Sequence, residues 1–390
     1  MYSFLLIIIY LAFISLGLPD SLLGSAWPVM HGQFNVPISY AGIVSMIIAG
    51  GTIISSLLSD KLTRRLGAGL VTSISVLMTA IALWGFSISD SFILICLMAI
   101  PYGLGAGAVD AALNNYVALH YASRHMSWLH CFWGVGAAIS PYIMGLCLTG
   151  GYGWNRGYFL VALIQIVLTA TLFISLPLWK RNNRVEKSNE NETATLTLHK
   201  ALKIRGVKLV LFTFFGYCAL ETTTGLWASS YLVKFRGIDL ETAAMFASLF
   251  YLGITFGRFL NGFLADKIKD KQLIRFGIMI IIFGVILIGL PFNINELALI
   301  GLVIVGLGCA PVYPSIIHAT PSNFGKENSQ AIIGIQMASA YLGSTFMPPL
   351  FGLIAGKINI GLYPLYLIIF ALLMFLMSEL LNRKIAVKNT

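Results

Sequence analysis

The sequence contains little charge. Only 10% of its 390 residues are Asp, Glu, Lys or Arg, whereas a soluble globular domain carries about 25%. Hydrophobic residues make up 58% of the chain. This composition excludes an ordinary soluble domain and indicates a protein that lies largely within a membrane.

The usual signatures of enzymes and metal proteins are also missing. There is no phosphate-binding P-loop and no Gly-rich nucleotide fingerprint, so we expect no ATP-driven chemistry. His120, His125 and His130 are spaced by five, which spreads them around a helix instead of aligning them as metal ligands. The five cysteines show no paired spacing and look like small packing residues. We therefore predict that the protein is not an enzyme and has no cofactor or metal.

Long apolar runs are what the sequence does contain. About 20 apolar residues span a bilayer as a helix, and twelve such stretches can be counted. They start near positions 3, 38, 68, 91, 128, 155, 206, 241, 274, 297, 329 and 359.

The basic residues follow the loops. With the N-terminus inside, 20 of the 25 Lys and Arg residues fall on the cytoplasmic side, and only Arg156, Lys234, Arg236 and Lys357 fall outside, with Arg258 inside a span. This asymmetry predicts that both termini are cytoplasmic. The net charge of +10 therefore reports topology and not nucleic-acid binding.

The second half of the chain repeats the first. The matching positions are Asp20 with Glu221, Gly51–Lys61 with Gly257–Lys267, Gly103–Gly105 with Gly306–Gly308, and Gly136, Pro141 and Gly145 with Gly343, Pro348 and Gly352. We predict an all-α membrane protein with twelve transmembrane helices in two pseudo-symmetric six-helix bundles. Residues 1–179 and 206–390 form the bundles, and the polar residues 180–205 form a cytoplasmic linker.

Three carboxylates interrupt the apolar spans: Asp20, Asp110 and Glu221. A charged side chain there costs roughly 2.5 to 3.5 kcal/mol, so such residues usually face a water-filled path. Burial favours the neutral form of a carboxyl group, which can then bind a proton near neutral pH. Asp110 is a candidate for proton coupling, solute binding or a structural hydrogen bond. Asp20 is a candidate for coupling or binding, and Glu221 for a solute site, a gate or a structural pair.

The loop after the second span carries a family motif. Major facilitator superfamily proteins have G-x-x-x-D-R/K-x-G-R/K-R/K there, and this chain has Ser56-Leu-Leu-Ser-Asp-Lys-Leu-Thr-Arg-Arg65, with a second version at 262–271. The chain resembles that superfamily, which implies that both loops latch the halves in one state. The residues assigned to these gating loops are Asp60, Lys61, Arg64, Arg65, Asp266 and Lys267.

Within the superfamily the chain is most similar to the fucose permease-like sugar:proton symporters. The resemblance rests on the contexts Leu18–Leu23 around Asp20 and Gly107–Asn114 around Asp110, where the branch usually has a glutamate. The branch's sugar-binding asparagine falls at Trp133. The resemblance therefore implies proton handling more directly than fucose recognition.

Polar and aromatic side chains accompany the acids in the spans that start near positions 3, 91, 128, 206, 297 and 329. The resemblance implies that several of these spans line a central cavity. Such a mixture suits sugars, whose hydroxyls need polar partners and whose C–H faces stack on aromatic rings. The predicted substrate-binding residues are Asp20, Asn114, His130, Trp133, Glu221, Trp227, Tyr313 and Gln336. Arg258 is expected to reach the interface or to pair with Asp266.

These features predict a proton-coupled symporter of a small polar solute, with a sugar as the first choice and Na+ as the alternative coupling ion. One alternative is a proton-driven efflux antiporter for amphipathic compounds, which an aromatic, Met-lined cavity favours. The other is a non-transporting membrane sensor. We expect a monomer in a bacterial cytoplasmic membrane, with a small solute and the lipid bilayer as its partners.

Overall fold

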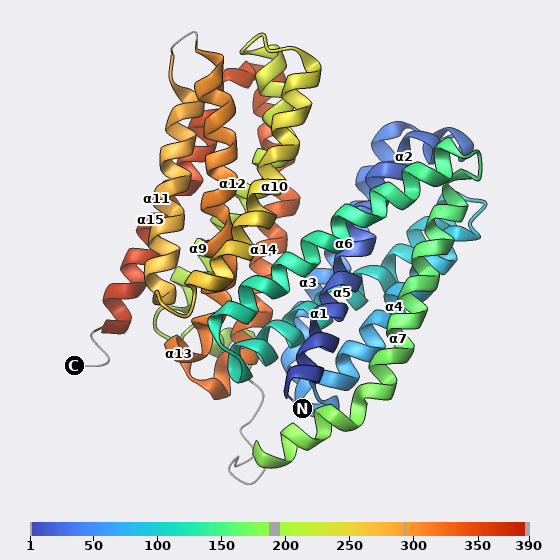
Figure 1. The fold of residues 1–390 in the computed structure, drawn as a ribbon, viewed down its shortest axis with the longest axis vertical. Coiled ribbons are helices and arrows are strands. Elements are labelled where there is room, and N and C mark those ends of the chain that lie inside the picture. The colour runs from blue at the N-terminus through green and yellow to red at the C-terminus, as the bar shows by residue number, and fades with distance from the viewer. Residues whose placement is uncertain (1, 187–195, 292–293, 387–390) are drawn as a thin grey trace. The chain divides into compact units, whose positions relative to one another are not determined.

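The computed structural model describes residues 2–186, 196–291 and 294–386, and in these ranges the chain is helical with no strand (Figure 1). It divides into two compact units. Unit 1 comprises Met1–Tyr116 and Leu129–Thr197, and unit 2 comprises Val117–Trp128 and Leu198–Thr390. The central part of the predicted linker, residues 187–195, lies outside the described residues.

The described residues of unit 1 form six long helices, the first of them in two pieces. They are α1 (Tyr2–Asp20) with α2 (Leu22–Gln33), α3 (Ala41–Leu66), α4 (Ala68–Ser87), α5 (Phe92–His120), α6 (Ser123–Thr149) and α7 (Gly153–Glu186). The end of α5 and the start of α6 are counted with unit 2. Helix α4 packs along α7, and α1 also contacts α7.

The part of unit 2 that the structure describes also contains six long helices. They are α9 (Val207–Lys234), α10 (Leu240–Leu264), α11 (Asp270–Gly289), α12 (Asn295–His318), α14 (Lys326–Ile354) and α15 (Tyr363–Ala386), with the short helices α8 (Leu198–Ala201) and α13 (Thr320–Phe324). Figure 1 shows α11 and α12 side by side, and α9 packs against both α14 and α15.

The apolar lengths match membrane helices. Among the described residues, eleven segments are long and apolar enough to cross a bilayer, and the last of these, Lys326–Ile385, contains both α14 and α15. Counting these two helices separately gives twelve. The prediction of an all-α fold with twelve apolar helices is therefore confirmed.

Glycines of the sequence repeat occupy equivalent helix contacts in the two units. A Cβ atom on Gly136 of α6 would clash with the carbonyl oxygen of Ile14 in α1, and one on Gly343 of α14 would clash with that of Phe215 in α9. Ile14 and Phe215 are separated by 201 positions, as Asp20 and Glu221 are. Small residues let helix backbones approach closely. The duplication therefore conserves the crossing of the first and fifth long helices of each unit.

The first helix is broken beside its acidic residue. Helix α1 ends at Asp20 and α2 starts at Leu22, directly after Pro19, which lacks an amide hydrogen. Helix α6 supports the break: Ser140 Oγ donates to the carbonyl oxygen of Leu18, and Ser21 Oγ donates to that of Ala137 at 2.7 Å. The break thus holds the Asp20 carboxylate at a fixed point along α6.

Candidate functional site

A buried chain of hydrogen bonds joins α5 to α6 in unit 1. Asn114 Nδ2 donates to Asp110 Oδ1 at 2.7 Å, and His130 Nε2 lies 3.0 Å from Asn114 Oδ1. Asp110, Asn114 and His130 are 8%, 0% and 5% exposed. We call these three residues the Asp110 cluster.

The direction of the hydrogen bonds in the Asp110 cluster follows from the chemistry of the amide. The Asn114 nitrogen faces a carboxylate oxygen, so its own oxygen is left as an acceptor, and His130 must donate through a protonated Nε2. The edge of Phe13 packs on the His130 ring at 5.3 Å. The hydrogen bond that Asp110 accepts is therefore linked, through the Asn114 amide, to the tautomer of His130.

Asp20 lies in a second group of donors in the same unit. Tyr102 Oη donates to Asp20 Oδ1 at 3.0 Å, and Trp133 Nε1 donates to Asp20 Oδ2 at 2.9 Å. Asp20 is exposed, in contrast to Asp110. We call Asp20, Tyr102 and Trp133 the Asp20 cluster. Tyr102 was missed in the sequence, where only its place eight residues before Asp110 in an apolar span marks it.

Helix α6 contributes to both groups. His130 and Trp133 are three residues apart and therefore lie on one side of the helix. A Cβ atom on Gly17 of α1 would clash with the carbonyl oxygen of Trp133, so α1 lies directly against this turn of α6. The close approach of α1 and α6 explains why Trp133 reaches Asp20.

A buried ion pair forms the corresponding group in unit 2. Arg258 Nη2 of α10 lies 3.4 Å from Glu221 Oε1 of α9 and 3.4 Å from Tyr217 Oη. The guanidinium carbon lies 5.9 Å from the centre of the Tyr313 ring in α12. Arg258 is only 3% exposed. We call these four residues the Glu221 cluster.

The expectation for Arg258 was wrong. The residue neither reaches an interface nor pairs with Asp266, because its side chain turns into unit 2 and meets Glu221. An unpaired guanidinium in a low-dielectric interior is strongly unfavourable. The acidic residue on the adjacent helix α9 supplies the missing counter-charge. Sequence alone could not show this pairing, because it depends on the rotation of α9 relative to α10.

Of the four predicted substrate-binding residues in unit 2, two lie outside the Glu221 cluster. Trp227 Nε1 donates to the carbonyl oxygen of Pro348 at 3.0 Å, so its polar group is already used between α9 and α14. Gln336 is fully buried, and its Oε1 accepts from Thr320 Oγ1 at 3.1 Å. Tyr313 donates to Met337 Sδ at 3.3 Å while its ring faces Arg258. Of these three residues, only Tyr313 joins the Glu221 cluster.

The first gating loop, in unit 1, contains a local ion pair. Arg64 Nε lies 2.9 Å from Asp60 Oδ1, one helical turn away in α3. Asp60 is 5% exposed, whereas Lys61, Arg64 and Arg65 are exposed. The single buried charge of this loop is therefore the carboxylate.

The second loop holds the start of α6 within unit 2. Asp266 accepts from the backbone nitrogen of Arg124 at 3.4 Å and lies 2.5 Å from its Nε. Asp270 accepts from Ser123 Oγ and lies near His318 Nδ1, both at 2.7 Å. Carboxylates near the first turn of a helix are stabilising. The neighbouring Lys267 is exposed.

Curated relatives with transport activities match along most of the chain. The cis,cis-muconate transport protein of Acinetobacter baylyi is 24% identical, with 90% of this chain and 87% of that protein covered. The glucose/mannose transporter GlcP of Bacillus subtilis is 22% identical, with 88% and 86% covered.

Solved structures show the same fold. The transporter FucP in its outward conformation has a TM-score of 0.81 at 15% identity, with 96% of this chain and 98% of that chain covered; FucP is a fucose:proton symporter of E. coli. The proton:xylose symporter XylE has a TM-score of 0.76 at 14% identity, with 95% and 94% covered.

The family assignment rests on the sequence profile as well as on the fold. The profile of the Major Facilitator Superfamily matches residues 9–336 and 238–385. These ranges cover both units and the three polar clusters. The chain belongs to the Major Facilitator Superfamily, a family of membrane transporters and not of enzymes.

Proposed function

We propose that this transporter moves a small polar solute, with a sugar as the first choice, by proton-coupled symport with alternating access. The Asp110 cluster is the single observation that carries the proposal. It places a titratable carboxyl group in a buried chain of hydrogen bonds inside an apolar helix. In the proposal, residues 1–179 and 206–390 move as two bundles, and the chain acts as a monomer.

Proton coupling needs a carboxyl group that changes charge during the cycle. An ionised carboxylate inside the bilayer is costly, so a carboxyl group binds a proton when it loses its contact with water and releases the proton when that contact returns. Asp110 is 8% exposed, and its state is relayed through Asn114 to His130. We assign the proton to Asp110, with Asp20 as the second titratable group and Na+ as the alternative ion.

The Asp20 cluster has the chemistry of a sugar subsite. A carboxylate offers about four acceptor positions, and Tyr102 and Trp133 occupy two of them. About two positions remain for solute hydroxyl groups, and the exposed carboxylate is open to them. Trp133 also brings an aromatic ring, on which the apolar face of a sugar can stack.

The Glu221 cluster favours a neutral solute over an anion. Arg258 already faces the Glu221 carboxylate, so an anionic solute would have to displace that partner. An organic anion is nevertheless the second candidate, because a buried guanidinium is the group that best binds a carboxylate. The muconate transport protein among the relatives adds weight to this candidate.

The orientation in the membrane is also proposed from charge. The excess of basic residues in one set of loops supports cytoplasmic termini and a cytoplasmic linker. On this orientation the gating loops with Asp60 and Asp266 are cytoplasmic. A bacterial plasma membrane is the proposed location.

Counterflow in proteoliposomes tests the solute class. Vesicles preloaded with an unlabelled hexose should take up the labelled hexose. Vesicles preloaded with a hexuronate or a muconate should not take up the same labelled anion. Hexose counterflow supports the sugar proposal. Exchange of the anions without hexose exchange would replace it with the organic-anion candidate, and no exchange with either panel would refute both.

A further inference from the structure

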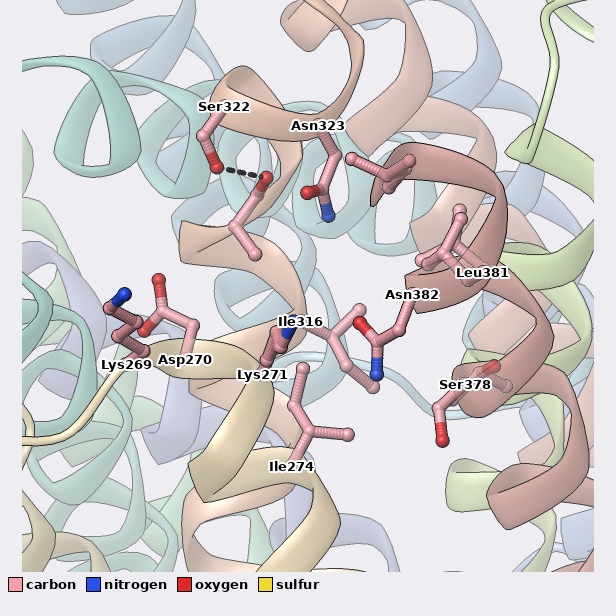
Figure 2. A pocket seen from close by; sticks show the side chains of 14 residues that line it. Lys269, Asp270, Lys271, Ile274, Ile316, Ser322, Asn323, Ser378, Leu381 and Asn382 are labelled. Atoms are coloured by element: carbon pink, nitrogen blue, oxygen red, sulfur yellow. Dashed lines mark hydrogen bonds between the residues drawn. The ribbon is translucent and has the colours of Figure 1, made fainter. Parts of the chain in front are cut away.

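A second polar site lies in unit 2, away from the Glu221 cluster. It is a cavity of about 370 Å³ between the starts of α9 and α11 and the ends of α12 and α15, closed on one side by α13 (Figure 2). Pockets for small molecules typically measure about 300–1,000 Å³. No residue of the Glu221 cluster lines this cavity.

The cavity is positively charged. Lys269 and Lys271 line it at the start of α11, and neither lysine has an acidic partner within the described residues. Asp270 also lines the cavity, and its two oxygens engage Ser123 Oγ and His318 Nδ1. Two lysines against one carboxylate leave the lining with a net positive charge.

The other lining residues supply neutral hydrogen-bond donors and apolar surface. Figure 2 shows Asn323 of α13 and Asn382 of α15 pointing into the space between these helices. The apolar side chains of Ile274, Ile316 and Leu381 also line the cavity. Ammonium and amide groups are donors for a ligand that only accepts hydrogen bonds, and phosphate oxygens are such acceptors.

The depth of the cavity fits a lipid headgroup. Lys269 and Lys271 lie at the start of the apolar segment Asp270–Gly289, which places their ammonium groups at the edge of the hydrocarbon layer. Basic pockets between helix ends hold anionic headgroups on the cytoplasmic side of membranes. The apolar lining side chains can contact the first carbons next to such a headgroup.

We propose that this cavity binds a phosphate-bearing anion, presented either by an anionic phospholipid or by a soluble phosphate compound. Both sources offer the same phosphate group to Lys269, Lys271 and the two asparagines. The site is independent of the transported solute, because it shares no residue with the three polar clusters.

Thermal unfolding of the purified full-length protein in neutral detergent tests the proposal. Phosphatidylglycerol is titrated as the anionic lipid, phosphatidylcholine as the neutral lipid, and sodium phosphate against sodium chloride at equal ionic strength. The test variant is Lys269→Gln with Lys271→Gln. The matched control is Lys200→Gln with Lys203→Gln, two exposed lysines of the same unit that do not line the cavity.

We expect phosphatidylglycerol or phosphate to raise the unfolding temperature of the wild type. The apparent affinity should fall roughly 30-fold in the test variant, the loss expected for two lysine contacts, and should be unchanged in the control. An effect of the lipid alone identifies a headgroup site, and an effect of sodium phosphate identifies a soluble ligand.

Equal stabilisation by phosphatidylcholine, no response to either phosphate source, or equal affinity in wild type and test variant would overturn the proposal. If the lysine variant does not fold, Asn323→Ala with Asn382→Ala takes its place. This pair should also weaken the response, and an unchanged affinity would again reject the site.

Discussion

Replacing Asp110 with asparagine should abolish proton coupling while solute binding persists. Asn has nearly the same shape as Asp, and its side-chain oxygen can still accept from Asn114 Nδ2, which now lies 2.7 Å from Asp110 Oδ1. A neutral hydrogen bond replaces a charge-assisted one, a loss of about 1 kcal/mol. We therefore expect Asp110→Asn to fold and to bind solute.

The energetic consequence for transport is large. A membrane potential of 100 mV contributes about 2.3 kcal/mol for each charge that moves with the solute, which corresponds to roughly 45-fold accumulation. Asp110→Asn has no proton to release, so the solute concentration inside the vesicles should rise only until it equals the concentration outside. Exchange of labelled for unlabelled solute requires no net proton movement and should persist.

The assay compares counterflow with gradient-driven uptake in the same proteoliposomes. Asp20→Asn and Glu221→Gln serve as controls, and both are expected to weaken solute binding more than coupling. If Asp110→Asn still concentrates solute with normal proton influx, the carrier is another residue and the assignment to α5 is wrong.

Three further predictions concern packing, charge and the gating loops. Gly136→Val should lower the unfolding temperature, with a loss of at least about 1–3 kcal/mol in the free energy of unfolding from overpacking against Ile14. Gly145→Val in the same helix, where a Cβ atom meets nothing within 4 Å, should leave the unfolding temperature unchanged. Equal losses in the two variants would refute the crossing of α1 and α6. Glu221→Gln should destabilise the protein by about 3 kcal/mol in thermal unfolding because it removes the negative charge that Arg258 faces. Replacing Arg258 with Gln as well should recover part of the loss, and no recovery would mean that the pair is not coupled. Asp60→Asn should slow transport while solute binding stays within about tenfold, since a latch acts on conformational states; lost binding with an unchanged transport rate contradicts this.

The fold could be predicted because it depends on local and repeating signals. Apolar length marks each helix, and the repeated glycines mark the helix crossings, so Gly136 and Gly343 could be paired from the sequence alone. Asp110 and Asn114 could be placed together because residues four apart share a helix face.

Tertiary partners were harder to predict. Tyr102 and Arg258 reach their carboxylates only through the rotation of one helix against another, and no spacing along the chain encodes that rotation. Trp227 and Gln336 looked like solute ligands in sequence. Trp227 Nε1 donates to Pro348, and Gln336 Oε1 accepts from Thr320 while the buried Gln336 Nε2 has no hydrogen-bond partner in the described residues. Neither of these contacts follows from spacing along the chain.

Proton movement on addition of solute tests the central claim most directly. Wild-type protein is reconstituted into vesicles with no imposed gradient, a hexose is added outside, and external pH is recorded together with uptake of the labelled sugar. Proton-coupled symport predicts that the medium becomes more alkaline as sugar enters, and that Asp110→Asn abolishes this change. Sugar entry without any proton movement, or with protons leaving the vesicles, would contradict the proposal.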